Sequence, residues 1–98
     1  MKNLKVTNLM KNDKSIANQF MLYYVENGKK YKIFQSYDSM IIKWENGIII
    51  EVGADWEYSR TTGKYRNLLT YTNKKEFEKM LKNDFEWNAD TQSYIRKK

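Results

Sequence analysis

The stretch Asp55–Tyr65, with the sequence DWEYSRTTGKY, is where predicted β-structure gives way to helix. The residues before it alternate as strands do, and inside it three hydroxyl residues are suited to cap a helix N-terminus: Ser59, Thr61 and Thr62. The charge changes at the same place, because residues 44–58 carry four acids and no base, whereas residues 59–75 carry five bases and no acid. We therefore expect strands before this junction and helices after it.

Two Asn-Gly dipeptides before the junction predict two successive β-hairpins. A two-residue turn at Asn27-Gly28 pairs Glu26 with Lys29, Tyr24 with Tyr31, Leu22 with Ile33, and Phe20 with Gln35. We interpret one face of this hairpin as the core face, with Phe20, Leu22, Tyr24, Tyr31 and Ile33. The opposite face is amphipathic and carries Met21, Tyr23, Val25, Lys30, Lys32 and Phe34.

In the second hairpin, the hydrophobic pattern favours a three-residue loop, Glu45–Gly47, with Gly47 as a G1 bulge. A two-residue turn at Asn46-Gly47 would place Ile42 opposite Glu51 and mix the two faces of the sheet. The longer loop instead pairs Trp44 with Ile48, Ile42 with Ile50, and Met40 with Val52. We therefore predict the bulged loop.

After the junction, apolar spacing predicts a helix from Arg60 or Thr62 to Tyr71, with Trp56, Tyr58 and Tyr65 packing it onto the sheet. A second helix begins at Asn73, where Glu76 completes a capping box, and ends near Asn83. The aromatic residues that flank the turn-prone segment 88–91 predict a C-terminal hairpin or edge strands. Residues 1–14 form a loose arm or a short first strand.

These elements predict one α+β domain over residues 1–98, an antiparallel sheet with two short helices packed on one face. No apolar run reaches the roughly 20 residues that cross a bilayer, so we expect no membrane partner and a cytoplasmic location in a bacterial cell. The absence of Cys agrees with that location.

The chain also contains no His, which removes the commonest general base and metal ligand. A carboxylate site formed by Asp38, Glu51, Asp55 and Glu57 is the one catalytic arrangement worth weighing. Metal-dependent nucleases usually pair such acids with a lysine on the same strand, and here no lysine follows the acids until Lys64. We therefore interpret these residues as solvated acids at strand ends. We expect no enzyme activity, no metal and no cofactor.

Three blocks resemble a known family in their order and spacing: ANQF (Ala17–Phe20), FQSYDS (Phe34–Ser39) and DWEYSRTTGKY (Asp55–Tyr65). On these blocks the chain is similar to small uncharacterised proteins from phages, plasmids and integrated elements of low-GC Gram-positive bacteria. The resemblance covers residues 16–69 and not the last 25 residues. It implies a mobile-element protein, often an accessory or anti-defence factor, and because that family has no assigned activity, no functional residue can be carried over.

Two functions follow as hypotheses. The first is a non-enzymatic protein that binds and inhibits a host protein or nucleoprotein complex, an anti-CRISPR protein being its most concrete form. Its expected contacts are Arg60, Lys64, Arg66, Tyr37 and Asp38. The alternative is a module for single-stranded or other nucleic acid, with aromatic and basic residues on the outer face of the first hairpin: Tyr23, Lys30, Lys32 and Phe34. The net charge of +6 suits either hypothesis and is also an ordinary charge for solubility.

Overall fold

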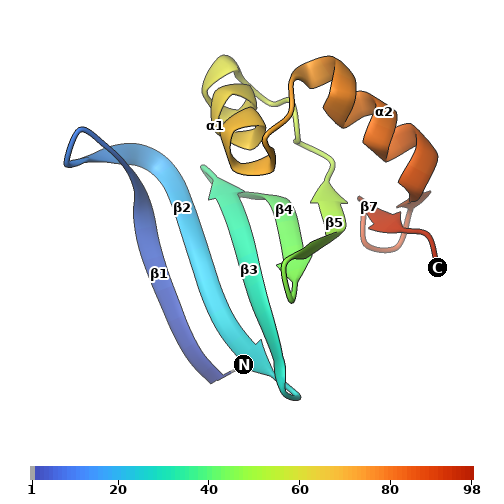
Figure 1. The fold of residues 1–98 in the computed structure, drawn as a ribbon, viewed down its shortest axis with the longest axis horizontal. Coiled ribbons are helices and arrows are strands. Elements are labelled where there is room, and N and C mark those ends of the chain that lie inside the picture. Colours follow the sequence, from blue (N-terminus) through green and yellow to red (C-terminus); the bar gives the residue numbers. More distant parts are fainter. Residues whose placement is uncertain (1) are drawn as a thin grey trace.

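A seven-stranded antiparallel sheet forms the body of the protein, with two helices inserted between its fifth and sixth strands along the chain (Figure 1). The computed structural model describes residues 2–98, with side chains from Asn3 onward. The elements are β1 (Lys2–Lys11), β2 (Lys14–Glu26), β3 (Lys29–Ser36), β4 (Ser39–Glu45), β5 (Ile48–Gly53), α1 (Arg60–Thr70), α2 (Lys74–Asp84), β6 (Phe85–Asn88) and β7 (Ser93–Arg96). The strand order is β1-β2-β3-β4-β5-β7-β6, so the C-terminal hairpin extends the sheet beside β5. The α+β class and the C-terminal hairpin are confirmed.

The N-terminal residues form a strand of ten residues at one edge of the sheet. β1 pairs with β2, with Val6 opposite Leu22. The connecting residues Asn12 and Asp13 have φ angles of 51° and 63°, as a type I′ hairpin turn requires. Asn and Asp visit this left-handed region more readily than other side chains do. A first strand is therefore confirmed in place of a loose arm, but it is longer than predicted.

The register of the hairpin β2–β3 is confirmed, whereas its predicted core face is wrong. Leu22 lies opposite Ile33 and Glu26 opposite Lys29, as the turn predicts. The core cluster lies on the other face, where Met21 is opposite Phe34, although Tyr24 of the predicted face is also buried. Both faces are apolar enough to form a core, and the helices, which follow β5, cover the face that carries Phe34 and Ile42.

The predicted register of the second hairpin is wrong by one residue next to the turn and by two residues beyond it. The turn is the two-residue Asn46-Gly47, with φ angles of 49° and 85°, and it pairs Trp44 with Ile49. The hydrophobic pattern is restored by a bulge in β5, because Lys43 pairs with Glu51 and leaves Ile50 as the extra residue. Ile42 then lies opposite Val52, so the apolar faces match although the short turn is kept.

β4 has a second bulge where it pairs with β3, and on its other side the end of β5 approaches its backbone closely. Phe34 pairs with Ile42 and Gln35 with Met40, so Ile41 is the extra residue, and both Ile41 and Ile42 are fully buried. At the end of β5, a Cβ atom on Gly53 would overlap the carbonyl oxygen of Met40. Gly53 is therefore required by close backbone approach.

The helices begin where their capping residues predict. Ser59 is the N-cap of α1, and its side-chain oxygen accepts a hydrogen bond from the backbone N–H of Thr62 at 3.1 Å. Asn73 caps α2 and exchanges the two hydrogen bonds of a capping box with Glu76, at 2.8 and 2.9 Å. α1 ends immediately before Tyr71, and α2 ends one residue after the predicted position.

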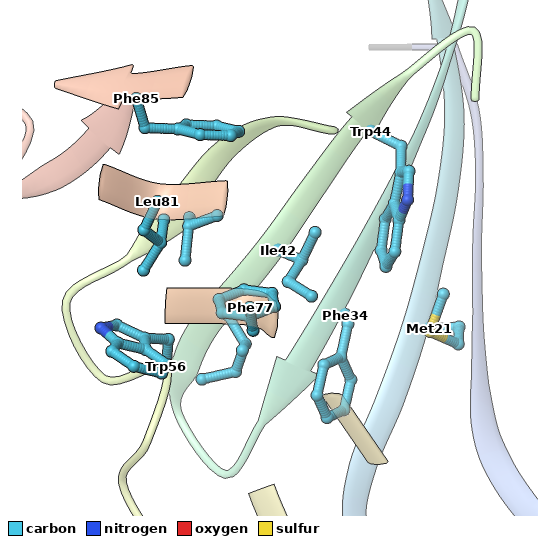
Figure 2. Packing of buried hydrophobic residues seen from close by; sticks show 10 residues of the cluster. Met21, Phe34, Ile42, Trp44, Trp56, Phe77, Leu81 and Phe85 are labelled. Carbon is cyan, nitrogen blue, oxygen red and sulfur yellow. The ribbon is translucent and has the colours of Figure 1, made fainter. Parts of the chain in front are cut away.

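The hydrophobic core lies between the two helices and one face of the sheet (Figure 2). Phe77 and Leu81 of α2 pack there beside residues from β3, β4 and β5, which include Phe34, Ile42 and Val52. Trp56, from the junction before α1, joins the same cluster. Tyr65 and Leu69 of α1 pack against it and remain partly exposed. The prediction that both helices pack on one face is confirmed.

We expect Gly53→Ala to lower the free energy of unfolding by about 2–3 kcal/mol, because the added methyl group forces β4 and β5 apart. Chemical denaturation of both variants measures the change. Gly63→Ala is the control, since its new Cβ lies 3.7 Å from the nearest atom and alanine favours the helix by about 1 kcal/mol. Equal denaturation midpoints for Gly53→Ala and the wild type would contradict the close approach.

Candidate functional site

The three sequence blocks of the family resemblance meet at one end of the sheet, where the β3–β4 turn approaches the start of α1 (Figure 1). Ser36 Oγ and Thr62 Oγ1 lie 2.8 Å apart in a hydrogen bond beneath the surface. Ser39 Oγ donates to Asp55 Oδ2 at 2.7 Å. The backbone N–H of Tyr37 donates to the carbonyl oxygen of Asn18, in the ANQF block, at 2.7 Å. Hydrogen bonds thus join segments that are far apart in the sequence into one polar cluster beneath the β3–β4 turn, and we call this cluster the polar support.

This support contains polar residues at positions that usually hold apolar ones. Ser36 and Thr62 are buried, and so is Gln19, which pairs with Ser36 across β2 and β3. The side-chain amide of Gln19 makes no hydrogen bond with the described residues 2–98. Unpaired buried polar groups cost stability, and each such group in a native structure calls for an explanation.

Tyr37 occupies a strained backbone position on top of this support. It lies in the two-residue connection between β3 and β4 and has a φ of 55°, a region that bulky side chains rarely adopt. The residue is 40% exposed, and its ring contacts the ring of Tyr58 edge-on, with 5.7 Å between centroids. Tyr58 is 64% exposed, so the prediction that it packs onto the sheet is wrong. The adjacent Asp38 is also exposed.

Arg66 was predicted to contact a partner, and the structure corrects that role, because only 2% of it is exposed. Its guanidinium lies 5.1 Å from the ring centroid of Trp56 and 5.0 Å from that of Phe77. Nη1 donates to the carbonyl oxygen of Trp56 at 2.7 Å, and Nε and Nη2 donate to Asn67 Oδ1 at 3.2 and 2.9 Å. Arg66 thus holds α1 against the junction and α2.

No carboxylate forms an ion pair with Arg66 in the part of the chain that the structure describes. Burial lowers the pKa of Arg66 below its usual value, while the charges of Glu57 and Glu78 act in the opposite direction. An arginine stays protonated in either case. The protein therefore keeps a positive charge just beneath the surface of α1.

A cleft of about 400 Å³ opens above this charge, between the first turns of α1 and α2. Arg60 and Lys64 line it as predicted, together with Lys74, which sequence reasoning missed because it lies on the second helix. Lys74 Nζ is 3.2 Å from Glu57 Oε2. Within residues 2–98, neither Arg60 nor Lys64 has a carboxylate within 4.0 Å. The cleft therefore has an excess of positive charge.

The predicted nucleic-acid surface is not available as a whole. Phe34 is fully buried in the core and cannot stack on a base, because its face of the sheet is the one the helices cover. Lys32 Nζ lies 4.5 Å from the ring centroid of Trp44. Tyr23 and Lys30 alone are exposed as predicted.

The acids weighed for a metal site do not come together. Among residues 2–98 no cluster of three or more His, Cys, Asp or Glu side chains has the arrangement of a metal site. Asp55 accepts the hydrogen bond from Ser39, and Glu51 accepts one from Ser93 at 2.7 Å. Neither described helix has the length and apolarity to cross a membrane.

We expect Arg66→Ala to lower the free energy of unfolding by about 3 kcal/mol or more, since it removes the packing between two rings and three hydrogen bonds. Arg66→Lys should remain destabilising, because an ammonium cannot reproduce the planar donor fork. Denaturation with Arg60→Ala as control measures this, and the control should change stability by about 0.5 kcal/mol or less. If Arg66→Ala were as stable as the wild type, the structural role of Arg66 would be contradicted.

The comparisons with known proteins identify a family and no function. No curated protein and no solved structure matches the chain. A family model matches residues 4–87, which extends beyond the three blocks at both ends and includes both helices. The chain belongs to this family, which is described as a family of unknown function, DUF8033.

Proposed function

We propose that this is a non-enzymatic, mobile-element binding protein that attaches to an acidic surface of a host protein or nucleoprotein and inhibits it. The carrying observation is that the basic cleft and the exposed tyrosine pair share one end of the molecule. Arg60 and Lys64 line the cleft, and Tyr58 lies two residues before Arg60. Tyrosine and arginine are favoured anchors in protein interfaces.

The charges of the cleft support an acidic partner. Arg60 and Lys64 project from the first two turns of α1 without a carboxylate partner among the described residues. The buried charge of Arg66 adds to theirs, because charges act more strongly through the low-dielectric interior than through water. Clusters of this kind bind carboxylates and phosphates, and they accelerate the encounter with an acidic surface.

The strain beneath the tyrosine pair supports a role in recognition. A left-handed tyrosine and an unpaired buried glutamine each cost stability at the place where the three blocks meet. Both are features that selection for stability alone would remove. Because Tyr37 and Tyr58 are both exposed, contact of their rings with a partner would explain why these costly features are kept.

The residue types of the chain and the partners of its acidic side chains support inhibition rather than catalysis. The chain has no His or Cys, Asp55 and Glu51 accept hydrogen bonds from serines, and Glu57 forms an ion pair with Lys74. The resemblance to proteins of phages and plasmids favours a host component as the target, a CRISPR nuclease being the most concrete example. A nucleic-acid module is the weaker alternative, because it has lost Phe34 as a stacking residue.

We expect the double variant Arg60→Glu/Lys64→Glu to lose at least about 100-fold in affinity for the host partner, because it reverses both charges that face the acidic surface. The measurement is capture from a low-GC Gram-positive lysate with tagged protein, followed by titration of the captured component. The fold should survive, since both positions are exposed and an acid at position 60 lies in the first turn, where it favours the helix N-terminus. Lys79→Glu/Lys82→Glu is the matched control on exposed positions of α2.

Retained capture by the Arg60/Lys64 variant would reject this site. Binding of single-stranded oligonucleotides that weakens steeply with salt and depends on Tyr23 and Lys30 would instead establish the alternative.

We expect Tyr37→Gly to weaken partner binding about 10-fold or more while the free energy of unfolding stays equal or rises by about 1 kcal/mol. Glycine relieves the backbone strain at φ 55° and removes the exposed ring. Tyr71→Gly is the matched control, because Tyr71 is also left-handed, with a φ of 57°, and 94% exposed, but lies at the other end of α1. If both variants bind equally well, Tyr37 is no anchor.

A further inference from the structure

The face of the sheet opposite the helices, here called the open face, carries a row of apolar side chains. Val6, Leu22 and Ile33 lie side by side across β1, β2 and β3, and Phe20 follows on β2 two residues from Leu22. This is the face that the sequence pattern of the first hairpin marks as a core. No element of residues 2–98 covers it, because all strands belong to one sheet and both helices pack on the other face.

The apolar residues of the open face are not part of the core described above. None of Val6, Phe20, Leu22 and Ile33 belongs to the core cluster or packs against it. Val6 is 54% exposed, and the other three are partly exposed. A contiguous apolar sheet face in water is a common sign of an interface.

The charges on β2 to β5 of the open face nearly cancel. Glu26 lies opposite Lys29, Lys29 forms an ion pair with Glu45 at 3.4 Å, and Lys43 lies opposite Glu51, so two lysines and three glutamates leave a net charge of −1. Lys43 Nζ also lies 5.0 Å from the ring centroid of Tyr31. The excess positive charge of the chain therefore lies elsewhere, and this part of the surface neither attracts a polyanion nor repels another basic molecule.

We propose that the open face binds a second copy of this chain, face to face, about a two-fold axis. A balanced pair such as Lys43 and Glu51 is self-complementary, because a two-fold axis near it sets the lysine of each copy towards the glutamate of the other. With a net charge of −1, this surface offers little attraction to an acidic or a strongly basic partner. A second copy also keeps the basic clefts of both chains on the outside.

The dimensions of the molecule suit this arrangement. The protein measures 37 × 34 × 22 Å, and Figure 1, which looks along the shortest axis, shows the strands spread across the broad outline. A stable interface takes about 800 Å² from each partner, which is less than that outline. Two sheets stack about 10 Å apart when aliphatic side chains interdigitate. The dimer then has four layers, with the sheets inside and the helices outside.

The test is the oligomeric state of the full chain, measured by light scattering and sedimentation over a range of concentrations. We expect a dimer whose dissociation constant rises roughly 100-fold or more in Ile33→Glu, because the two-fold axis buries a new carboxylate from each copy. Val6→Glu should act in the same direction. Since Val6 is 54% exposed, a folded monomer of that variant separates lost association from lost folding.

Leu68→Glu is the control, since Leu68 is an equally exposed aliphatic residue at 59%, but on α1. It should leave the dimer intact. A wild-type chain that stays monomeric at about 0.5 mM, a dimer that survives both open-face variants, or a dimer that only Leu68→Glu dissociates would overturn the proposal. These outcomes do not depend on the capture of a host partner, so this proposal and the proposed function can fail separately.

Discussion

The placement of both helices depends on one buried cation, Arg66 of α1. Its guanidinium contacts the rings of Trp56 and Phe77, which themselves stack with 5.3 Å between centroids, so one side chain joins the junction, α1 and α2. Taking a charge out of water is costly, and here two ring faces and two neutral oxygen acceptors offset that cost. Arginine suits this position better than lysine, because its flat, weakly hydrated group packs between rings and still donates in several directions.

The same contact determines the candidate site. Thr62 lies one turn before Arg66 on α1, and its hydroxyl bonds to Ser36 at the end of β3, so the fixed helix also fixes the turn that carries Tyr37. The charge of Arg66 lies beneath the cleft lined by Arg60 and Lys64 and strengthens its attraction for anions. Arg66, which the sequence suggested as a partner contact, is instead a buried residue that positions α1 and places a positive charge beneath the cleft.

Local chemistry made much of the fold predictable from the sequence. The Asn27-Gly28 turn, the caps Ser59 and Asn73, and the C-terminal hairpin depend on neighbouring residues alone, and each is confirmed. The second hairpin was not predictable in this way, because a bulge at Ile50 lets a two-residue turn and matched apolar faces coexist. The buried side of α1 was also not predictable from the hydrophobic pattern. Its buried residues are the polar Thr62 and Arg66, whereas the apolar Leu68 is exposed, so counting hydrophobic residues selects the wrong side chains.

The error in the core face has a different origin. Leu22 and Ile33 alternate with Met21 and Phe34, and Lys30 and Lys32 of β3 lie on the Phe34 face, so the strands alone favour the wrong face as the core. The choice is made by the connection after β5, which carries both helices to the side of Phe34, and by Gly53, which lets β5 approach β4 closely enough to continue that layer. Since the two helices cover a single face, the second apolar face is an unused core surface of the monomer. A sequence pattern that marks both faces of a hairpin as buried is therefore consistent with a sheet whose second layer comes from another chain.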